Sequence, residues 1–202
     1  EVELMELPYI LRSTMSTIPR MAPYLSVPLK AREAARTRCS APGFRIGLAW
    51  SSGDWNPERS ISLAQLEGLA RIPGVSLFSL QRGEASHEIN RCPDIDIIDT
   101  ERDLHSPTET AATILHMDLV ISVDTMVAHL AGALGAPVWL LLPHYADWRW
   151  MADRRDSPWY PTMRLFRQVG PGEWEPVIQE VAHALSKVAL LGRTGQSRPP
   201  SR

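Results

Sequence analysis

The clearest indication of the fold comes from the stretch Asp118-Leu119-Val120-Ile121-Ser122-Val123-Asp124-Thr125-Met126-Val127-Ala128-His129-Leu130-Ala131-Gly132-Ala133-Leu134. Its first six residues include a short apolar run, which is typical of a strand buried on both faces of a parallel sheet. An alanine-rich helix begins at once after this strand. A sharp strand-to-helix turn aims backbone amides and the positive end of the helix dipole at the ligand crevice. The stretch therefore predicts an α/β fold with an anion site at the turn.

The same alternation of apolar runs and helix-sized segments extends over residues 45–190. Two capping boxes, Ser62 with Gln65 and Ser106 with Glu109, mark helix starts independently. The pattern predicts a Rossmann-like doubly wound parallel sheet with helices on both faces, in one domain. Each strand should be followed by a helix-sized segment, and the last helix should cover about 176–188. The predicted strands are 46–50, 75–80, 95–98, 119–123, 138–142 and 163–166.

The two ends of the chain differ from this domain in composition. Residues 1–44 contain five prolines, which deny a helix its hydrogen bonds and favour extended geometry. We interpret them as a linker that connects to an N-terminal domain. Residues 191–202 are mostly arginine, serine, glycine and proline, and this composition cannot offset the entropy of ordering. We expect them to form a disordered tail.

Charge and cysteine content exclude several classes of protein. The net charge is −2 and no basic block is present, which argues against a nucleic-acid partner. The two cysteines stand apart and the six histidines are scattered, so neither a disulfide framework nor a metal site is indicated. No apolar run reaches the length of a transmembrane helix, and no charged-then-apolar leader is present. We therefore expect a cytoplasmic protein without a transmembrane segment.

Ligands of such sheets bind beyond the carboxyl ends of the strands, where three groups of residues qualify. The loop after the first strand lacks GxGxxG, but Arg59 offers a fork of donors suited to phosphate oxygens. Arg59 could equally be a solvated charge or a salt-bridge partner. Gln81 follows the second strand and could bind a base edge or a phosphate, or belong to an ordinary turn.

The strand-to-helix turn is the third group and the strongest. Thr125 adds a hydroxyl donor at the predicted anion site, and His129 lies one helical turn further on the same face. A diphosphate is the natural occupant of such a turn. The alternative is that Asp124 only caps the helix and that His129 is a hydrogen-bonded residue near the core.

A long loop after the fifth strand concentrates aromatic side chains and arginines. Trp148, Arg149 and Trp159 could stack on a sugar or a base and hold a phosphate. The aromatic residues of this loop, with Trp150 and Tyr160 among them, could equally form a small satellite core under the loop. A loop of this length in a compact domain usually has a function.

These motifs resemble a known family. The segment Ser122-Val123-Asp124-Thr125 with His129, followed by 131–142, resembles the donor-site signature of heptosyltransferases. More similar still are bacterial proteins in which tetratricopeptide repeats precede a GT-B glycosyltransferase domain, over 45–50, 59–61, 79–81 and 147–167. The resemblance implies the C-terminal half of a GT-B fold, which binds a nucleotide-diphosphate sugar as substrate without metal or cofactor. The implied donor-binding residues are Arg59, Gln81, Ser122, Asp124, Thr125, Met126 and His129.

Two departures limit what the resemblance implies. Heptosyltransferases commonly have glycine after the Asp-Thr pair, where this chain has Met126. The acceptor site of GT-B enzymes, and commonly their catalytic base, lie in an N-terminal half. We therefore expect this chain to be inactive alone. Only together with that half would it transfer a sugar to a glycan, lipid or protein acceptor. We assign no catalytic residue. The alternatives are a non-catalytic GT-B-like scaffold attached to tetratricopeptide repeats, and a sugar-nucleotide epimerase whose acid and base cannot be identified.

Overall fold

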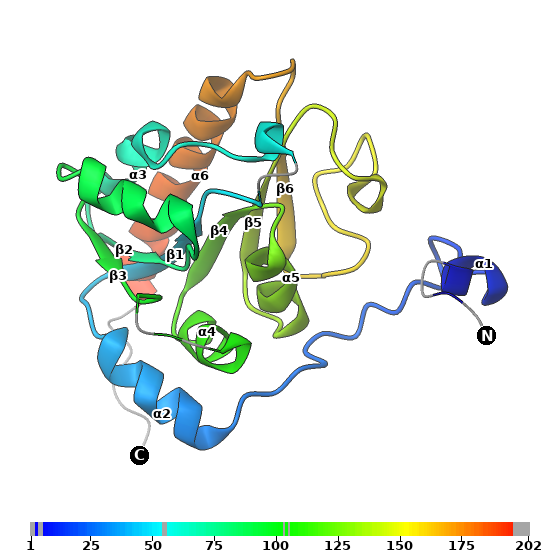
Figure 1. Cartoon of the computed structure of the whole chain (residues 1–202), viewed down its shortest axis with the longest axis horizontal. Helices are drawn as coiled ribbons and strands as arrows, with labels where there is room; N and C mark the ends of the chain where they lie inside the picture. The colour runs from blue at the N-terminus through cyan, green and yellow to red at the C-terminus, as the bar shows by residue number, and fades with distance from the viewer. Residues whose placement is uncertain (1–2, 4–5, 54–55, 103, 105, 196–202) are drawn as a thin grey trace.

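The protein is built around a single parallel sheet (Figure 1). The structure is a computed structural model and describes residues 3, 6–53, 56–102, 104 and 106–195. The strand order is β3-β2-β1-β4-β5-β6, with every neighbouring pair parallel. This order reverses direction between β1 and β4, as in doubly wound nucleotide-binding folds. The predicted fold class is confirmed, and every predicted strand agrees within two residues with β1 (Phe44–Ala49), β2 (Val75–Ser79), β3 (Ile97–Asp99), β4 (Leu119–Val123), β5 (Val138–Leu142) and β6 (Met163–Arg167).

Helices cover both faces of the sheet, so that two hydrophobic cores form. On one face lie α4 (Pro107–Ile114) and α5 (Met126–Ala133), and on the other lie α3 (Glu67–Ala70) and α6 (Trp174–Gly195) (Figure 1). Successive residues of a strand point to opposite faces. Val120 of β4 accordingly joins the core under α5, whereas its neighbours Leu119 and Ile121 join the core under α6. Burial on both faces explains why the central strands β4 and β5 are buried along their whole length and are almost entirely apolar.

Helix-sized segments do not follow every strand, and this part of the prediction is wrong. The segments after β1, β2 and β5 are mainly 3-10 turns, whereas α-helices of eight or more residues follow β3, β4 and β6. The turn η4 (Glu84–Arg91) buries none of its residues. Most helical stability in proteins comes from packing an apolar face, and η4 has no buried residue to supply one. The turns η3 (Leu63–Leu66) and η5 (Trp148–Trp150) do bury Leu63, Leu66 and Trp150, but each spans only three or four residues. Both predicted capping boxes do form, and the one at Ser62 opens the 3-10 turn η3 (Leu63–Leu66).

Part of the segment that we interpreted as a linker packs on the domain. Helix α2 (Leu29–Arg38) contacts α4, and its Ala35 is fully buried. Cys39 joins the core under α5, and the amide of Tyr24 donates to the carbonyl of Ala133 at 3.0 Å. By contrast, α1 (Leu7–Ile10) buries no residue and lies away from the sheet (Figure 1). Residues 24–39 therefore help to build the domain that the prediction began at 45.

The last helix is longer than predicted. Helix α6 runs to Gly195, so that residues 191–195, predicted as part of the disordered tail, are helical. A helix that is already nucleated adds each further residue at little cost, and leucine and arginine propagate it well. Residues 196–202 of the predicted tail lie outside the described residues. Across the described part of the chain, no helix combines the length and the apolar character that crossing a membrane requires.

Candidate functional site

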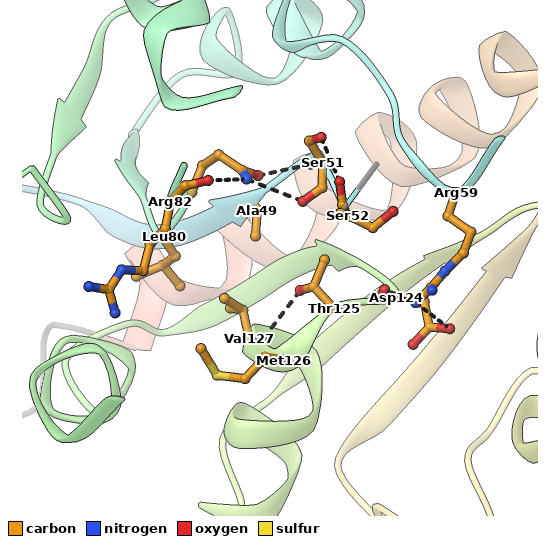
Figure 2. Close-up of a pocket in the computed structure, with 12 residues that line it drawn as sticks. Ala49, Ser51, Ser52, Arg59, Leu80, Arg82, Asp124, Thr125, Met126 and Val127 are labelled. Carbon is orange, nitrogen blue, oxygen red and sulfur yellow. Dashed lines mark hydrogen bonds and ion pairs between the residues drawn. The ribbon is translucent and has the colours of Figure 1, made fainter. Parts of the chain in front are cut away.

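A cleft of about 340 Å³ lies where the strand order reverses, beyond the carboxyl ends of β1 and β4 (Figure 2). Ser51, Ser52 and Gly53 line it from the loop after β1, and Gln81 and Arg82 line it from the end of β2. Residues 124–127 close it at the start of α5. The crevice at a reversal point is the usual ligand site of open α/β sheets. The fold therefore gathers three separate loops of the chain around one cleft.

Arg59 and Asp124 form an ion pair at one end of the cleft. Arg59 Nη2 lies 3.0 Å from Asp124 Oδ2, and the same nitrogen also donates to the Asp124 carbonyl. The Asp124 side chain is 3% exposed and that of Arg59 is 16% exposed. The salt-bridge alternative for Arg59 is thus present in the structure. The pair also joins the loop after β1 to the turn after β4 and holds the Arg59 guanidinium at the cleft.

His129 contacts the same carboxylate from the other side. Its Nε2 lies 3.6 Å from Asp124 Oδ1, and its ring stacks on Trp150 with centroids 5.2 Å apart. Burial alone would raise the pKa of Asp124, but His129, Trp150 and Arg59 together outweigh burial and lower it. Asp124 is therefore ionised at neutral pH. Its carboxylate thus contacts both Arg59 and His129, two side chains that we predicted to lie near a diphosphate.

Thr125, and not Asp124, caps helix α5. Its hydroxyl oxygen accepts from the amide of Val127 at 3.2 Å and lies 3.1 Å from the hydroxyl of Ser122. The Ser122 hydroxyl in turn donates to the carbonyl of Val123 at 2.7 Å. The alternative that made Asp124 the helix cap is thus wrong, because the Asp124 side chain turns toward Arg59. Ser122 is fully buried and supports the turn without lining the cleft.

Gln81 has its amide group committed to the backbone. Its Oε1 accepts from the amides of Trp50 and Ser51 at 2.9 and 2.8 Å, and its Nε2 donates to the carbonyls of Ser51 and Arg82. Gln81 is 7% exposed, although it lines the cleft. Its contacts make it a residue that shapes the loop after β1. A direct bond to a base edge or to phosphate would require these contacts to break.

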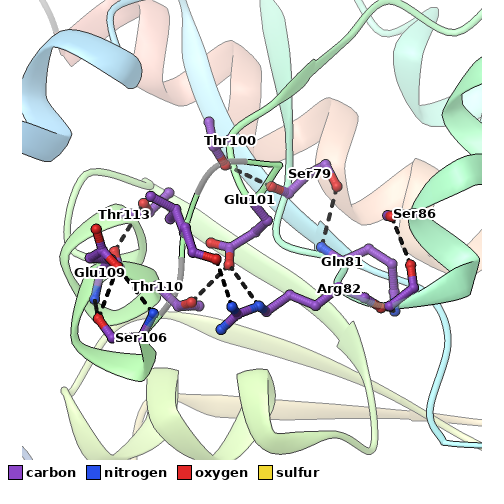
Figure 3. A network of polar contacts seen from close by, with 12 residues as sticks. Ser79, Gln81, Arg82, Ser86, Thr100, Glu101, Ser106, Glu109, Thr110 and Thr113 are labelled. Carbon is purple, nitrogen blue, oxygen red and sulfur yellow. Dashed lines mark hydrogen bonds and ion pairs between the residues drawn. The ribbon is translucent and has the colours of Figure 1, made fainter.

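Arg82 lies at the opposite end of the cleft from Arg59 and belongs to a polar network with Glu101 (Figures 2 and 3). Arg82 Nη2 donates to the carbonyl of Leu104 at 2.7 Å, and Arg82 Nε lies 3.7 Å from Glu101 Oε2. The hydroxyl of Thr110 donates to the same carboxylate at 2.8 Å. Burial raises the pKa of Glu101. Within the described residues, Glu101 Oε1 has no hydrogen-bond partner.

The sequence contained no signal for Glu101. A single glutamate between a short strand and a capped helix has no motif spacing, and its burial and its contacts with Arg82 and Thr110 arise only from tertiary packing. Ser60 was missed for a similar reason. Its hydroxyl accepts from the amide of Ser52 at 3.0 Å and from the hydroxyl of Ser51, which is nine residues earlier in the sequence. Ser60 therefore helps to fix the loop after β1.

Met126 stands at the rim of the cleft. It is 47% exposed and is the first residue of α5. Its side chain lines the cleft beside Thr125 and Val127 (Figure 2). A glycine at this position would leave the first amides of the helix more open to a ligand.

The aromatic loop between β5 and β6 contributes to the main core and lines a second pocket. Trp150 is fully buried and Tyr160 is 9% exposed, and both belong to the core under α5 and not to a separate satellite core. Trp148 is 55% exposed, and Trp148, Arg149 and Trp159 line a pocket of about 270 Å³ together with His129. The stacking of Trp148, Arg149 and Trp159 on a sugar or a base stays a prediction.

No family model matches the chain. Protein FlbA of Caulobacter vibrioides is 32% identical over 193 residues, which is 89% of this chain but 31% of that protein. The fold is similar to that of Escherichia coli ADP-heptose lipopolysaccharide heptosyltransferase II, with a TM-score of 0.64, 17% identity, and coverage of 89% of this chain and 57% of that one. E. coli heptosyltransferase WaaC with ADP gives a TM-score of 0.56 at 14% identity, with coverage of 85% and 53%.

These similarities define a class of fold. The chain has the Rossmann-like α/β fold found in GT-B glycosyltransferases, including heptosyltransferases. It spans about a third of the length of FlbA and a little over half of each heptosyltransferase. The chain thus has a glycosyltransferase-like fold.

Proposed function

We propose that the cleft binds the diphosphate of a nucleotide-diphosphate sugar, and that the chain is the donor-binding domain of a metal-independent glycosyltransferase. The observation that carries the proposal is the composition of the cleft at the strand reversal. The start of α5 lies between two guanidinium groups, Arg59 and Arg82, and opposite the small side chains of Ser51 and Ser52. Helix N-termini and arginines are the groups that proteins use to bind phosphate oxygens.

The same groups would serve sugar transfer. Departure of a nucleoside diphosphate places growing negative charge on its phosphate oxygens. A fixed helix dipole and fixed arginines stabilise that charge without reorganising. Asp124 offsets part of the Arg59 charge, because its carboxylate lies 3.0 Å from the guanidinium. Acceptor recognition and the transfer step itself belong to the proposal for the whole protein, of which a preceding acceptor half and tetratricopeptide repeats would be parts.

Met126 favours a second function. Its side chain lines the mouth of the cleft where heptosyltransferases commonly have glycine, and it is 47% exposed there. A GT-B-like domain whose cleft is narrowed could act as a non-catalytic scaffold. Such a scaffold would bind no nucleotide sugar, so that one binding experiment separates the two functions.

The experiment is isothermal titration calorimetry of the full chain with ADP, UDP and GDP and with their common sugar conjugates. We expect one nucleoside diphosphate to bind and Arg82→Met to weaken that binding at least tenfold, because Arg82 offers charge-assisted hydrogen bonds at the cleft. Arg71→Met is the matched control, since Arg71 is paired with Glu67 on the surface and does not line the cleft. Absence of binding by all the nucleotides would refute the donor function and favour the scaffold.

A further inference from the structure

A second pocket lies on the far side of His129 from the cleft. It has a volume of about 270 Å³ and is lined from three parts of the chain: the N-terminal segment, helix α5 and the loop between β5 and β6. Among the residues that the structure describes, the two sites share no lining residue. Its main lining residues are Tyr24, His129, Trp148, Arg149, Trp159 and Tyr160.

Two indole rings form a corner of this pocket. The rings of Trp148 and Trp159 meet edge to face, with centroids 6.2 Å apart and planes at 84°. Trp148 is 55% exposed, whereas Trp150, two residues further along the same loop, is fully buried. Leaving an indole in water forgoes the free energy that its burial would contribute. The loop thus buries one tryptophan as a core residue and presents another at the pocket.

The corner is held in place by polar contacts that do not depend on a ligand. The indole nitrogen of Trp159 donates to the carbonyl of Arg149 at 2.8 Å. Asp147 accepts from the Arg149 amide at 3.0 Å and pairs with the Arg149 guanidinium at 3.0 Å. That guanidinium lies over the Trp148 ring, 5.7 Å from its centroid. A ligand that stacks here would not bear the cost of ordering these side chains.

The floor of the pocket is polar. His129 Nδ1 lies 3.0 Å from the hydroxyl of Tyr160, and Tyr160 is 9% exposed. Burial, together with the neighbouring Tyr24 hydroxyl, raises the pKa of Tyr160, so that its hydroxyl keeps its proton at neutral pH. Arg149 adds a guanidinium that is 37% exposed. The pocket therefore combines flat apolar walls with a small number of hydrogen-bonding groups, as ligand pockets usually do.

We propose that this pocket binds the pyranose ring of a sugar. One face of a pyranose carries several C–H groups and packs flat on an aromatic ring, while its hydroxyls point outward to polar groups. The perpendicular indoles offer one flat wall and one edge, which suits a ring with an apolar face and a polar rim. A nucleobase is flat and apolar on both faces, and two parallel rings would suit it better.

The position of the pocket relates it to the proposed donor site. His129 lines the pocket, and its Nε2 lies 3.6 Å from Asp124, which lines the donor cleft. A single carboxylate–imidazole contact thus separates the two sites. The pyranose could come from the donor's own sugar or from an acceptor glycan, and both sources present the same ring to the indoles.

The test is saturation-transfer NMR on the full chain with two sets of probes. The first set contains methyl pyranosides of glucose, galactose, mannose and N-acetylglucosamine; the second contains UDP-glucose, UDP-N-acetylglucosamine, ADP-glucose and GDP-mannose. We expect saturation of the pyranose ring protons of at least one probe. We expect Trp148→Ala to weaken its binding at least tenfold, which corresponds to about 1.4 kcal/mol, and Trp148→Phe to retain most of it.

Tyr145→Ala is the matched control, because Tyr145 is 72% exposed on the same loop and does not line the pocket. Saturation from free pyranosides identifies an acceptor sugar, and saturation of pyranose protons only in sugar nucleotides identifies the donor sugar. Base protons report on the donor cleft separately, so saturated base protons with unsaturated pyranose protons would refute this proposal while leaving the donor function intact. The proposal is also overturned if no pyranose proton is saturated, or if Trp148→Ala binds as the unsubstituted chain does.

Discussion

Removal of the Arg59 guanidinium should destabilise the domain through the charge that it leaves behind. In Arg59→Met the side chain keeps much of its length and apolar stem, but the Asp124 carboxylate loses its partner at 3.0 Å. That carboxylate is 3% exposed, so water cannot take the place of the guanidinium. His129 still faces Asp124 at 3.6 Å and provides partial compensation.

The expected magnitude follows from these distances and exposures. Breaking a buried ion pair from one side costs about 3–5 kcal/mol. Because Arg59 is 16% exposed and His129 remains, we expect the free energy of unfolding to fall by about 2–3 kcal/mol at pH 7. Replacing the carboxylate as well, in Arg59→Met/Asp124→Asn, removes the unpaired charge. The double variant should therefore recover part of the loss, with a coupling energy of about 1–3 kcal/mol.

Urea unfolding followed by circular dichroism measures this effect. With an m value of about 2.5 kcal/mol/M, the midpoint of Arg59→Met should fall by about 1 M. Arg71→Met removes a surface pair with Glu67 and should change the free energy of unfolding by less than about 1 kcal/mol. Two results together would refute the pairing argument. The free energies of unfolding lost in Arg59→Met and in Asp124→Asn would each be as small as the loss in this control, and the loss in the double variant would equal their sum.

The pH dependence of the same variant has a defined sign. Asp124 has a lowered pKa in the folded protein, so its pairing stabilises the fold above the ordinary aspartate pKa, and this contribution is lost as the pH falls through the lowered value. In Arg59→Met the buried carboxyl takes up a proton more readily. The difference in the free energy of unfolding between the unsubstituted chain and Arg59→Met should therefore be largest at pH 7 and should shrink as the pH approaches 4.

Three further predictions concern stability. Gln81→Leu should lower the free energy of unfolding by about 1–3 kcal/mol in urea titrations, because it leaves two loop amides without an acceptor; an unchanged midpoint would contradict this. Glu101 has a raised pKa in the folded protein, so stability should decline as the pH rises from the ordinary glutamate value through the raised one, and Glu101→Gln should flatten that decline in melting temperature. Gly132→Ala places a Cβ 2.5 Å from Cγ of Tyr160, and calorimetric unfolding should show a loss of about 1–3 kcal/mol, unless Tyr160 moves without cost.

Most strands could be predicted because the pattern of a buried apolar run is complete within five or six residues, as in β4 and β5. The same holds for the turn at residues 122–125, where strand and helix are adjacent in sequence. The 3-10 turns after β1, β2 and β5 could not be predicted, because helical stability depends on the surface that a segment packs against. The packing of helix α2 on the domain could not be predicted for the same reason, since its contact is with α4, far along the chain.

The strand-to-helix turn and the residue types around it follow from the sequence alone, because local backbone geometry and hydrophobic period depend on neighbouring residues. What those side chains contact follows only from the tertiary structure. Arg59 and Asp124 lie 65 residues apart and pair because the strand order brings the ends of β1 and β4 together. Trp148 and Trp150 are two residues apart, yet one is exposed at a pocket and the other is buried beside His129. Burial and pairing are properties of the packed molecule, since they depend on residues that are distant in the sequence.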